Sequence, residues 1–239
     1  AAADDYRNQL VTKMQHSDAL TILRDLSLDG VAPNIAFQDL EKLIEFVEKK
    51  FLKRKLSGAG LELGSGPAPF SAVLAKRPEI QKMYAVEICR PIVEMLMPKI
   101  AEEVAGSAAG KVVGCVGEFN NLELPDKSVD FMIDFFSLHH SPDPIKTLKE
   151  CQRVLKSNGI VICFDKARPD YLTQENLNHL LDKEYDDDFK KRMDIPLTPK
   201  FTRRQNGENE YRLKDWQRFF DQAGFSKFHH FRLDQCRGG

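Results

Sequence analysis

The stretch LELGSGPAPFS, residues 61–71, is the part of the sequence that decides the fold. A short apolar run, residues 58–63, leads into it, and the helical pattern of residues 69–77 leads out of it. A buried strand that turns through glycines into a helix is the arrangement that holds nucleotide cofactors in many α/β proteins. The residues of this turn therefore indicate which cofactor the chain suits.

Strands and helices alternate around this turn. Besides the strand at 58–63, short apolar runs predict strands at residues 83–87, 111–117, 129–136, 159–165 and 226–233. Helical spacing of apolar residues predicts helices at residues 37–51, 69–77, 91–104, 143–156 and 213–225. This alternation is typical of an α/β fold with a doubly wound, mostly parallel sheet, in which ligands bind beyond the carboxyl ends of the strands.

We expect the whole chain, residues 1–239, to form a single domain with four parts. These are an N-terminal helical segment, a cofactor-binding core, a substrate cap, and a last helix and strand, at residues 1–57, 58–165, 166–211 and 212–239. The cap is assigned to the third part because a polar, irregular sequence there interrupts the alternation after the fifth strand.

Composition argues against several classes of protein. Of the 239 residues, 42% are hydrophobic, which suits a sizeable core, and a net charge of -1 gives no electrostatic case for binding nucleic acid or an anionic membrane. No apolar run approaches the roughly 18 residues of a membrane helix. The five cysteines lack metal-ligand spacing and the first residues do not resemble a secretory signal, so we expect reduced thiols in a cytoplasmic protein.

The glycine turn itself discriminates between cofactors. A phosphate-binding loop of the type GxxxxGK followed by Ser or Thr is absent, and the dinucleotide pattern GxGxxG fails at its third glycine, where Pro69 stands. Glu62, two positions before Gly64, would repel a pyrophosphate. It would suit a cofactor that carries an ammonium and a sulfonium group, with an attraction on the order of a few kcal/mol at a partly buried site.

Three stretches together resemble class I S-adenosylmethionine-dependent methyltransferases of the small-molecule type. ELGSGPA, residues 62–68, resembles the first motif of that family, an acidic residue followed by GxGxG, with Ala68 in place of the third glycine. GEFNNLELPDKSVDFMIDFFSLHH, residues 117–140, resembles GDAxxLPFPDxSFDxVxxxxxLHH without a gap. KTLKECQRVLKSNGIVI, residues 146–162, resembles LxExxRVLKPGGxLxI. The resemblance covers residues 58–165 well and residues 213–225 loosely.

The resemblance implies a Rossmann-like fold that binds S-adenosyl-L-methionine. Glu87 ends the second strand and would accept hydrogen bonds from the ribose hydroxyls, Glu118 would meet the adenine amino group, and Phe119 would pack on the adenine. Asp134 and Phe135 would line the methionine part. The full set of expected cofactor-binding residues is Glu62, Gly64, Ser65, Gly66, Glu87, Ile88, Glu118, Phe119, Asp134 and Phe135.

Two neighbouring histidines, His139 and His140, follow the fourth predicted strand and are candidates for a general base. The alternative is that one packs on the following helix while the other is solvated. Asp134 and Asp165 end neighbouring strands, yet the sequence offers no third oxygen ligand beside them, so no metal is expected.

The predicted function is transfer of a methyl group to a small or medium-sized acceptor by in-line displacement, driven mainly by positioning. DFFS, residues 134–137, stands where enzymes that methylate DNA bases or protein glutamine commonly carry Asn or Asp, two prolines and an aromatic residue, which disfavours those acceptors. Two alternatives stay open: an NAD(P)-dependent oxidoreductase, and a non-catalytic partner subunit with a methyltransferase fold. The methylated atom, the oligomeric state and the place of the family's seventh strand also stay open.

Overall fold

The computed structural model of the protein describes residues 40–192 and 196–232. A five-stranded parallel sheet forms its centre, with strand order β3-β2-β1-β4-β5. The strands are β1 Gly58–Leu63, β2 Ile80–Glu87, β3 Val112–Val116, β4 Val129–Phe135 and β5 Leu155–Phe164. Strand order reverses between β1 and β4, so the predicted doubly wound α/β sheet is confirmed and its ligand-binding edge lies beyond the ends of these two strands.

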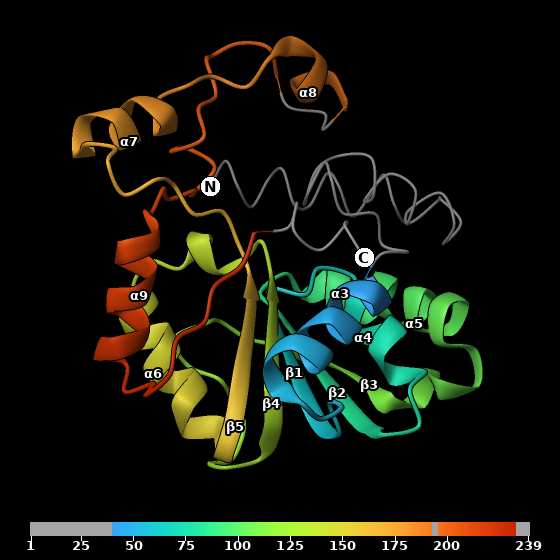
Figure 1. Ribbon diagram of the computed structural model, residues 1–239. Coiled ribbons are helices and arrows are strands. Elements are labelled where there is room, and N and C mark those ends of the chain that lie inside the picture. Colours follow the sequence, from blue (N-terminus) through green and yellow to red (C-terminus); the bar gives the residue numbers. More distant parts are fainter. Residues whose placement is uncertain (1–39, 193–195, 233–239) are drawn as a thin grey trace.

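Helices cover both faces of the sheet (Figure 1). One face carries α3 Leu40–Val47, α4 Pro69–Ala75 and α5 Met97–Ala105, whereas α6 Pro144–Val154 and α9 Leu213–Gln222 lie on the other. Short π-helical turns follow α3 and precede α5, at Glu48–Leu52 and Ile92–Leu96. Single 3-10 turns occupy Gly106–Lys111 and Leu138–His140. The helices thus form two outer layers, one on each face of the sheet.

The alternation of side chains in β1 explains why the sheet is buried on both faces. Leu61 and Leu63 pack with Cys151 and Val154 of α6, while Gly60 faces the α4 side. A Cβ atom at Gly60 would lie 2.4 Å from Phe131 Cζ and 2.6 Å from Met83 Sδ. Glycine at this position therefore lets two large side chains meet over the middle of the sheet.

The cap, residues 166–211, lies beyond the carboxyl ends of the strands (Figure 1). It contains α7 Gln174–Leu181 and α8 Asp187–Arg192, joined by irregular chain. Its two ends are tied to each other because Arg168 N donates to Tyr211 O at 2.8 Å and Leu213 N donates to Arg168 O at 3.1 Å. This position agrees with a substrate cap, and that role remains a prediction.

Several elements differ from their expected bounds by a few residues, and two differ in a way that changes the fold locally. The helix predicted at 143–156 ends at Val154 and β5 already begins at Leu155, where a register shift opposite Val129 and Phe131 lets the chain turn directly into the strand. The strand predicted at 226–233 is wrong over its described residues, 226–232, which form no ladder. Instead, the Phe231 ring lies 5.4 Å from the ring of Phe46, so aromatic packing and not strand pairing explains the apolar pattern there.

The part of the predicted N-terminal helical segment before residue 40, and the residues after 232, lie outside the described residues. None of the helices in the described ranges has the length and apolar character needed to cross a bilayer.

Candidate active site

The loop between β1 and α4 turns through three residues in the left-handed conformation. Gly64, Gly66 and Ala68 have φ angles of +56°, +53° and +60°. A Cβ at Gly64 would lie 2.5 Å from Ser137 Cβ, so glycine allows this loop to contact the turn after β4. At Gly66 nothing lies within 4 Å of such an atom, so the backbone there borders open space. Ala68 adopts a conformation that favours glycine, which accounts for the family pattern at that position.

Glu62 does not face this open space. Its carboxylate is buried and accepts hydrogen bonds from the backbone N–H of Ser71, at 2.8 Å, and from the Ser71 hydroxyl. Burial raises the pKa of Glu62 to about 8. The expected direct attraction between Glu62 and a cationic cofactor therefore has no support in this geometry. Glu62 instead ties the strand before the glycine loop to the helix after it.

Glu87 does reach the loop. Its two carboxylate oxygens accept the N–H of Gly66 at 3.2 Å and the N–H of Cys89 at 2.9 Å. The side chain is half-buried at the end of β2, and the neighbouring Ile88 is 54% exposed, which is unusual for a large apolar residue. A carboxylate has further lone pairs after two such bonds, so Glu87 retains capacity for hydroxyl donors.

Phe119 and Glu118 lie on the other side of the same loop. The Phe119 ring approaches Gly64, since its Cζ would lie 3.1 Å from a Cβ at that position. Glu118 is exposed and its carbonyl accepts the N–H of Asn121 at 3.3 Å. Arg153 holds the following loop by donating to the carbonyls of Leu122, at 2.8 Å, and Leu124, at 2.9 Å. These contacts fix the segment that carries both expected adenine-binding residues.

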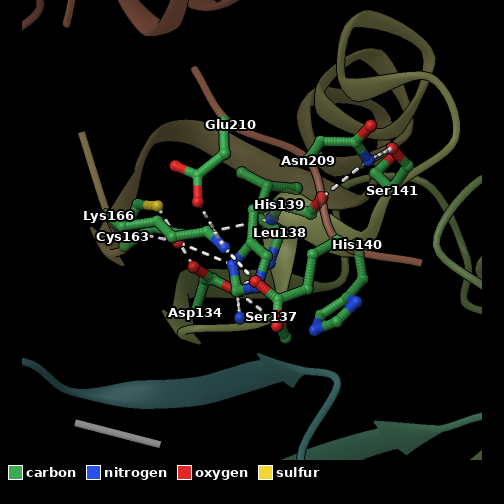
Figure 2. Close-up of polar contacts among 12 residues, drawn as sticks. Asp134, Ser137, Leu138, His139, His140, Ser141, Cys163, Lys166, Asn209 and Glu210 are labelled. Atoms are coloured by element: carbon green, nitrogen blue, oxygen red, sulfur yellow. Dashed lines mark hydrogen bonds and ion pairs between the residues drawn. The ribbon is translucent and has the colours of Figure 1, made fainter. Parts of the chain in front are cut away.

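The turn after β4 is organised by Asp134. This fully buried carboxylate accepts the N–H of Leu138 at 2.8 Å, the N–H and hydroxyl of Ser137, and the thiol of Cys163 at 3.1 Å (Figure 2). Burial, with a contribution from Asp165, raises the pKa of Asp134 to about 7. Between Asp134 and Ser137 the chain reverses at Phe136, whose φ is +53°. Asp134 would thus shape a methionine-binding turn through its backbone contacts.

Ligand atoms of Asp134, Cys163 and Asp165 lie within 4.8 Å of one another. The sequence did not indicate Cys163 as a member of this group, because it faces Asp134 only through the pairing of β4 with β5. Burial raises the pKa of the Cys163 thiol, whose S–H donates a hydrogen bond to Asp134. A protonated thiol and a carboxylate already bonded to protein donors are poor metal ligands, so the cluster is best explained as a hydrogen-bonded turn.

Phe135 lies in the core between the sheet and α4. Its ring stacks on Phe70 and Phe164, with centroids 4.1 Å and 4.8 Å away. Its side chain is therefore used in packing, and its predicted contact with the cofactor would have to involve the backbone.

His139 and His140 stand side by side above the end of β4, with ring centroids 4.2 Å apart. His139 makes two contacts with Asp165, which follows the end of β5. The backbone N–H of His139 donates to Oδ2 at 2.9 Å, and its ring Nδ1 lies 2.7 Å from Oδ1. His140 Nδ1 lies 3.1 Å from the carbonyl oxygen of Gly207. The pairing with Asp165 was missed from the sequence, although adjacent parallel strands that end together place these residues at one edge.

The cap reaches this same edge. Asn209 donates its side-chain amide to the carbonyl of His139 at 2.8 Å (Figure 2). Lys166 forms an ion pair with Glu208. Glu210, whose side chain is fully buried, is held by Arg168 and by Arg203 at 3.0 Å. Cap, histidines and the ends of β4 and β5 therefore form one connected wall beside the glycine loop.

Comparison with known proteins agrees with this geometry. Residues 61–163 match the family described as a methyltransferase domain. A demethylmenaquinone methyltransferase of Bacillus velezensis is 32% identical over 117 residues, which are 47% of this chain and 50% of that protein. One from Staphylococcus epidermidis is 40% identical over 53 residues, 22% of each chain. The chain thus spans half or less of the length of these curated relatives.

Solved structures show the same fold. The YcgJ protein of Bacillus subtilis superposes with a TM-score of 0.55 at 21% identity, covering 83% of this chain and 75% of that one. A putative sarcosine dimethylglycine methyltransferase from Galdieria sulphuraria gives a TM-score of 0.57 at 17% identity, covering 79% and 60%. At these identities the likeness concerns the fold alone.

Proposed function

We propose, because the chain belongs to the class I S-adenosylmethionine-dependent methyltransferases, that it transfers a methyl group from S-adenosylmethionine to a small or medium-sized acceptor. The observation that carries the proposal is the contact of Glu87 with the N–H of Gly66. It couples the acid that would bind a ribose to the glycine loop that would border the rest of the cofactor.

The residues around the loop fit this cofactor. Glu87 would accept the ribose hydroxyls, the exposed Ile88 and the ring of Phe119 would enclose the adenine, and Glu118 would receive its amino group. The backbone of Gly64, Ser65 and Gly66, with the Asp134 turn, would border the methionine part. Pro69, which stands at the third glycine position of the dinucleotide pattern GxGxxG, disfavours the pyrophosphate of NAD.

The cofactor supplies an activated methyl group, so the protein mainly positions the two reactants and excludes water. Good orientation alone can contribute roughly 7–11 kcal/mol to such a reaction. The glycine loop would hold one reactant, and the cap with the His139–His140 turn would hold the other. Either histidine would act as a base only if the acceptor has a proton to lose.

The acceptor would be chosen by the cap, which lies outside the residues that match the family. Demethylmenaquinone, the acceptor in the names of the relatives, belongs in the first set of compounds to test. We expect neither nucleic acid nor membrane as a partner, given the net charge of -1. A cytoplasmic location fits the free thiols of Cys89, Cys115, Cys151 and Cys163.

Calorimetric titration with S-adenosylmethionine, S-adenosylhomocysteine and NADH tests the proposal. We expect both sulfur compounds to bind and NADH not to bind. Binding of NADH alone would identify an oxidoreductase, and no binding at millimolar concentration would point to a non-catalytic partner subunit. A methyl-labelled cofactor incubated with metabolite extracts would then identify the product.

A further inference from the structure

The geometry points to His139 as the base that deprotonates the methyl acceptor, to Asp165 as the residue that orients its ring, and therefore to a phenolic hydroxyl as the reacting group of the acceptor. This inference rests on the proposed methyl transfer. It adds a partner for the histidine and a chemical class for the substrate.

Asp165 holds His139 at two points. One carboxylate oxygen accepts the backbone N–H at 2.9 Å and the other lies 2.7 Å from ring Nδ1. Both side chains are nearly enclosed, with 7% of His139 and 2% of Asp165 exposed. Since an ionised carboxylate only accepts hydrogen bonds, Asp165 places the ring proton on Nδ1. The imidazole is then fixed in the tautomer whose Nε2 carries a lone pair.

No residue in the described part of the chain forms a hydrogen bond with Nε2 that would occupy that lone pair. Within the described ranges, the buried side-chain polar atoms that lack a hydrogen-bond partner are Arg77 Nη1 and Ser128 Oγ. Nε2 of His139 is not among them, so this unpaired atom is accessible to solvent. Such an atom on an otherwise buried ring is open to a small molecule. The same arrangement of carboxylate, imidazole and open nitrogen is how proteins prepare a histidine to take a proton.

The surroundings of the ring keep it neutral, with its Nε2 lone pair free, at physiological pH. Asp134 of β4, Asp165 at the end of β5, His140 of the same turn, and Lys166, Glu208 and Glu210 from the cap side all face His139. Burial and, after it, the charge of Lys166 lower the pKa of His139 to about 4, while the carboxylates oppose this shift. Burial raises the pKa of Asp165 to about 7. The neutral ring beside an ionised Asp165 is therefore the form present above about pH 7.

This chemistry selects the acceptor. A neutral amine already has a free lone pair and needs no base, whereas a phenol, with a pKa of about 10, must lose its proton to become a strong nucleophile. In the step, the acceptor O–H bond breaks and its proton moves to His139 Nε2. An oxygen lone pair forms the bond to the methyl carbon, and the pair of the breaking carbon–sulfur bond stays on sulfur. The positive charge thus passes from the sulfonium to the imidazolium, which returns the proton to solvent.

The first test needs no cofactor. Nitrogen-15 NMR of the free, histidine-labelled protein, with the His139→Gln variant to assign the signal, reports which ring nitrogen of His139 is protonated. At pH 7.5 we expect protonated Nδ1 and unprotonated Nε2, and a mixture of tautomers in Asp165→Asn. A proton on Nε2 at pH 7.5 in the unchanged protein would overturn the proposal, because that nitrogen could not accept another.

The second test uses the reaction. His139→Gln should lower kcat at pH 7.5 by roughly 100-fold or more, with part of the rate regained at higher pH and with unchanged affinity for S-adenosylhomocysteine. His230→Gln, at an exposed position after α9 and outside the cap, serves as the matched control. An unchanged kcat, or labelled methyl groups on nitrogen, carbon or sulfur alone, would contradict the inference while leaving methyl transfer intact. Failure of both sulfur compounds to bind would instead remove the proposed function.

Discussion

Ser71, in the first turn of α4, donates both its backbone N–H and its hydroxyl to the buried carboxylate of Glu62 in β1. The two residues bracket the glycine loop, so their contact fixes the angle at which the chain passes from strand to helix. Glu62, the acidic residue of the first motif, therefore stabilises the loop from the protein interior. Glu87 contacts the loop at Gly66, where the backbone borders open space.

Replacing Glu62 with glutamine should make the stability of the protein less dependent on pH. The ordinary pKa of a glutamate is 4.5 and burial raises that of Glu62 to about 8, so the folded state binds the extra proton between these values. The free energy of unfolding of the natural protein should thus fall as pH rises from about 5 to 8, by an amount on the order of 3–5 kcal/mol for this group. Urea unfolding at pH 5, 7 and 8.5 measures it.

In Glu62→Gln that part of the pH dependence should disappear, because the amide oxygen can still accept from Ser71 but no longer titrates. Glu45→Gln on the exposed face of α3 is the control and should follow the natural protein. If the free energy of unfolding depends on pH equally in all three proteins, Glu62 is ionised at neutral pH in the folded state.

Glu87→Ala should weaken binding of S-adenosylhomocysteine by roughly 100-fold or more, because two charge-assisted hydrogen bonds of about 1.5–3 kcal/mol each would be lost. The affinity of Glu87→Gln should lie between those of the natural protein and of Glu87→Ala, since its amide oxygen can still accept from Gly66 or Cys89. Calorimetry measures the affinities, and Glu41→Ala on α3 is the control. An affinity unaffected by either change would show that the ribose lies elsewhere.

The sequence predicted the features that depend on local patterns. β1 was predicted at its true bounds, Gly58–Leu63, because a short apolar run ends there in glycines that need left-handed backbone. The boundary between α6 and β5 was missed because Leu155 and Lys156 continue the apolar–polar spacing of the helix. The segment 226–232 was misassigned because Phe231 packs on α3 and β5, and Phe228 on α9, contacts that no local pattern contains.

Within the candidate site, too, the sequence predicted what depends on local patterns and missed what depends on tertiary contacts. The pattern assigned Gly66 and Glu87 to the same cofactor site, and in the structure they are in contact. The direction of the Glu62 side chain, the stacking of Phe135 and the pairing of His139 with Asp165 all depend on residues from other elements. Sequence spacing therefore located the edge of the sheet, while tertiary packing decided which side chains face it.

Arg153→Lys should destabilise the loop that carries Glu118 and Phe119. The guanidinium bonds the carbonyls of Leu122 and Leu124 and both oxygens of Glu150, a geometry that a single ammonium group cannot reproduce. We expect a loss of about 1–3 kcal/mol in the free energy of unfolding and weaker binding of the cofactor. Thermal unfolding and calorimetry measure the two effects.

Arg90→Lys is the control for this change, because Glu94, on an exposed helix face, is the only ion-pair partner of Arg90 among the described residues. It should alter neither quantity measurably, as is usual for exposed ion pairs. If Arg153→Lys behaves like Arg90→Lys, the loop is held by its own packing and not by Arg153.

Phe136 has a φ of +53°, an unfavourable conformation for a bulky residue, and its N–H donates to Phe164 O at 2.8 Å. Comparing Phe136→Gly with Phe136→Ala isolates the backbone term, because both lose the ring. Glycine should be the more stable of the two by about 1 kcal/mol, since it has no Cβ to clash in the left-handed region. At Lys82, an exposed position within β2, the order should reverse, with Lys82→Gly less stable than Lys82→Ala. Urea unfolding of the four variants measures both differences. If the alanine variant is the more stable one at both positions, the turn after β4 relaxes out of the left-handed region once the ring is removed.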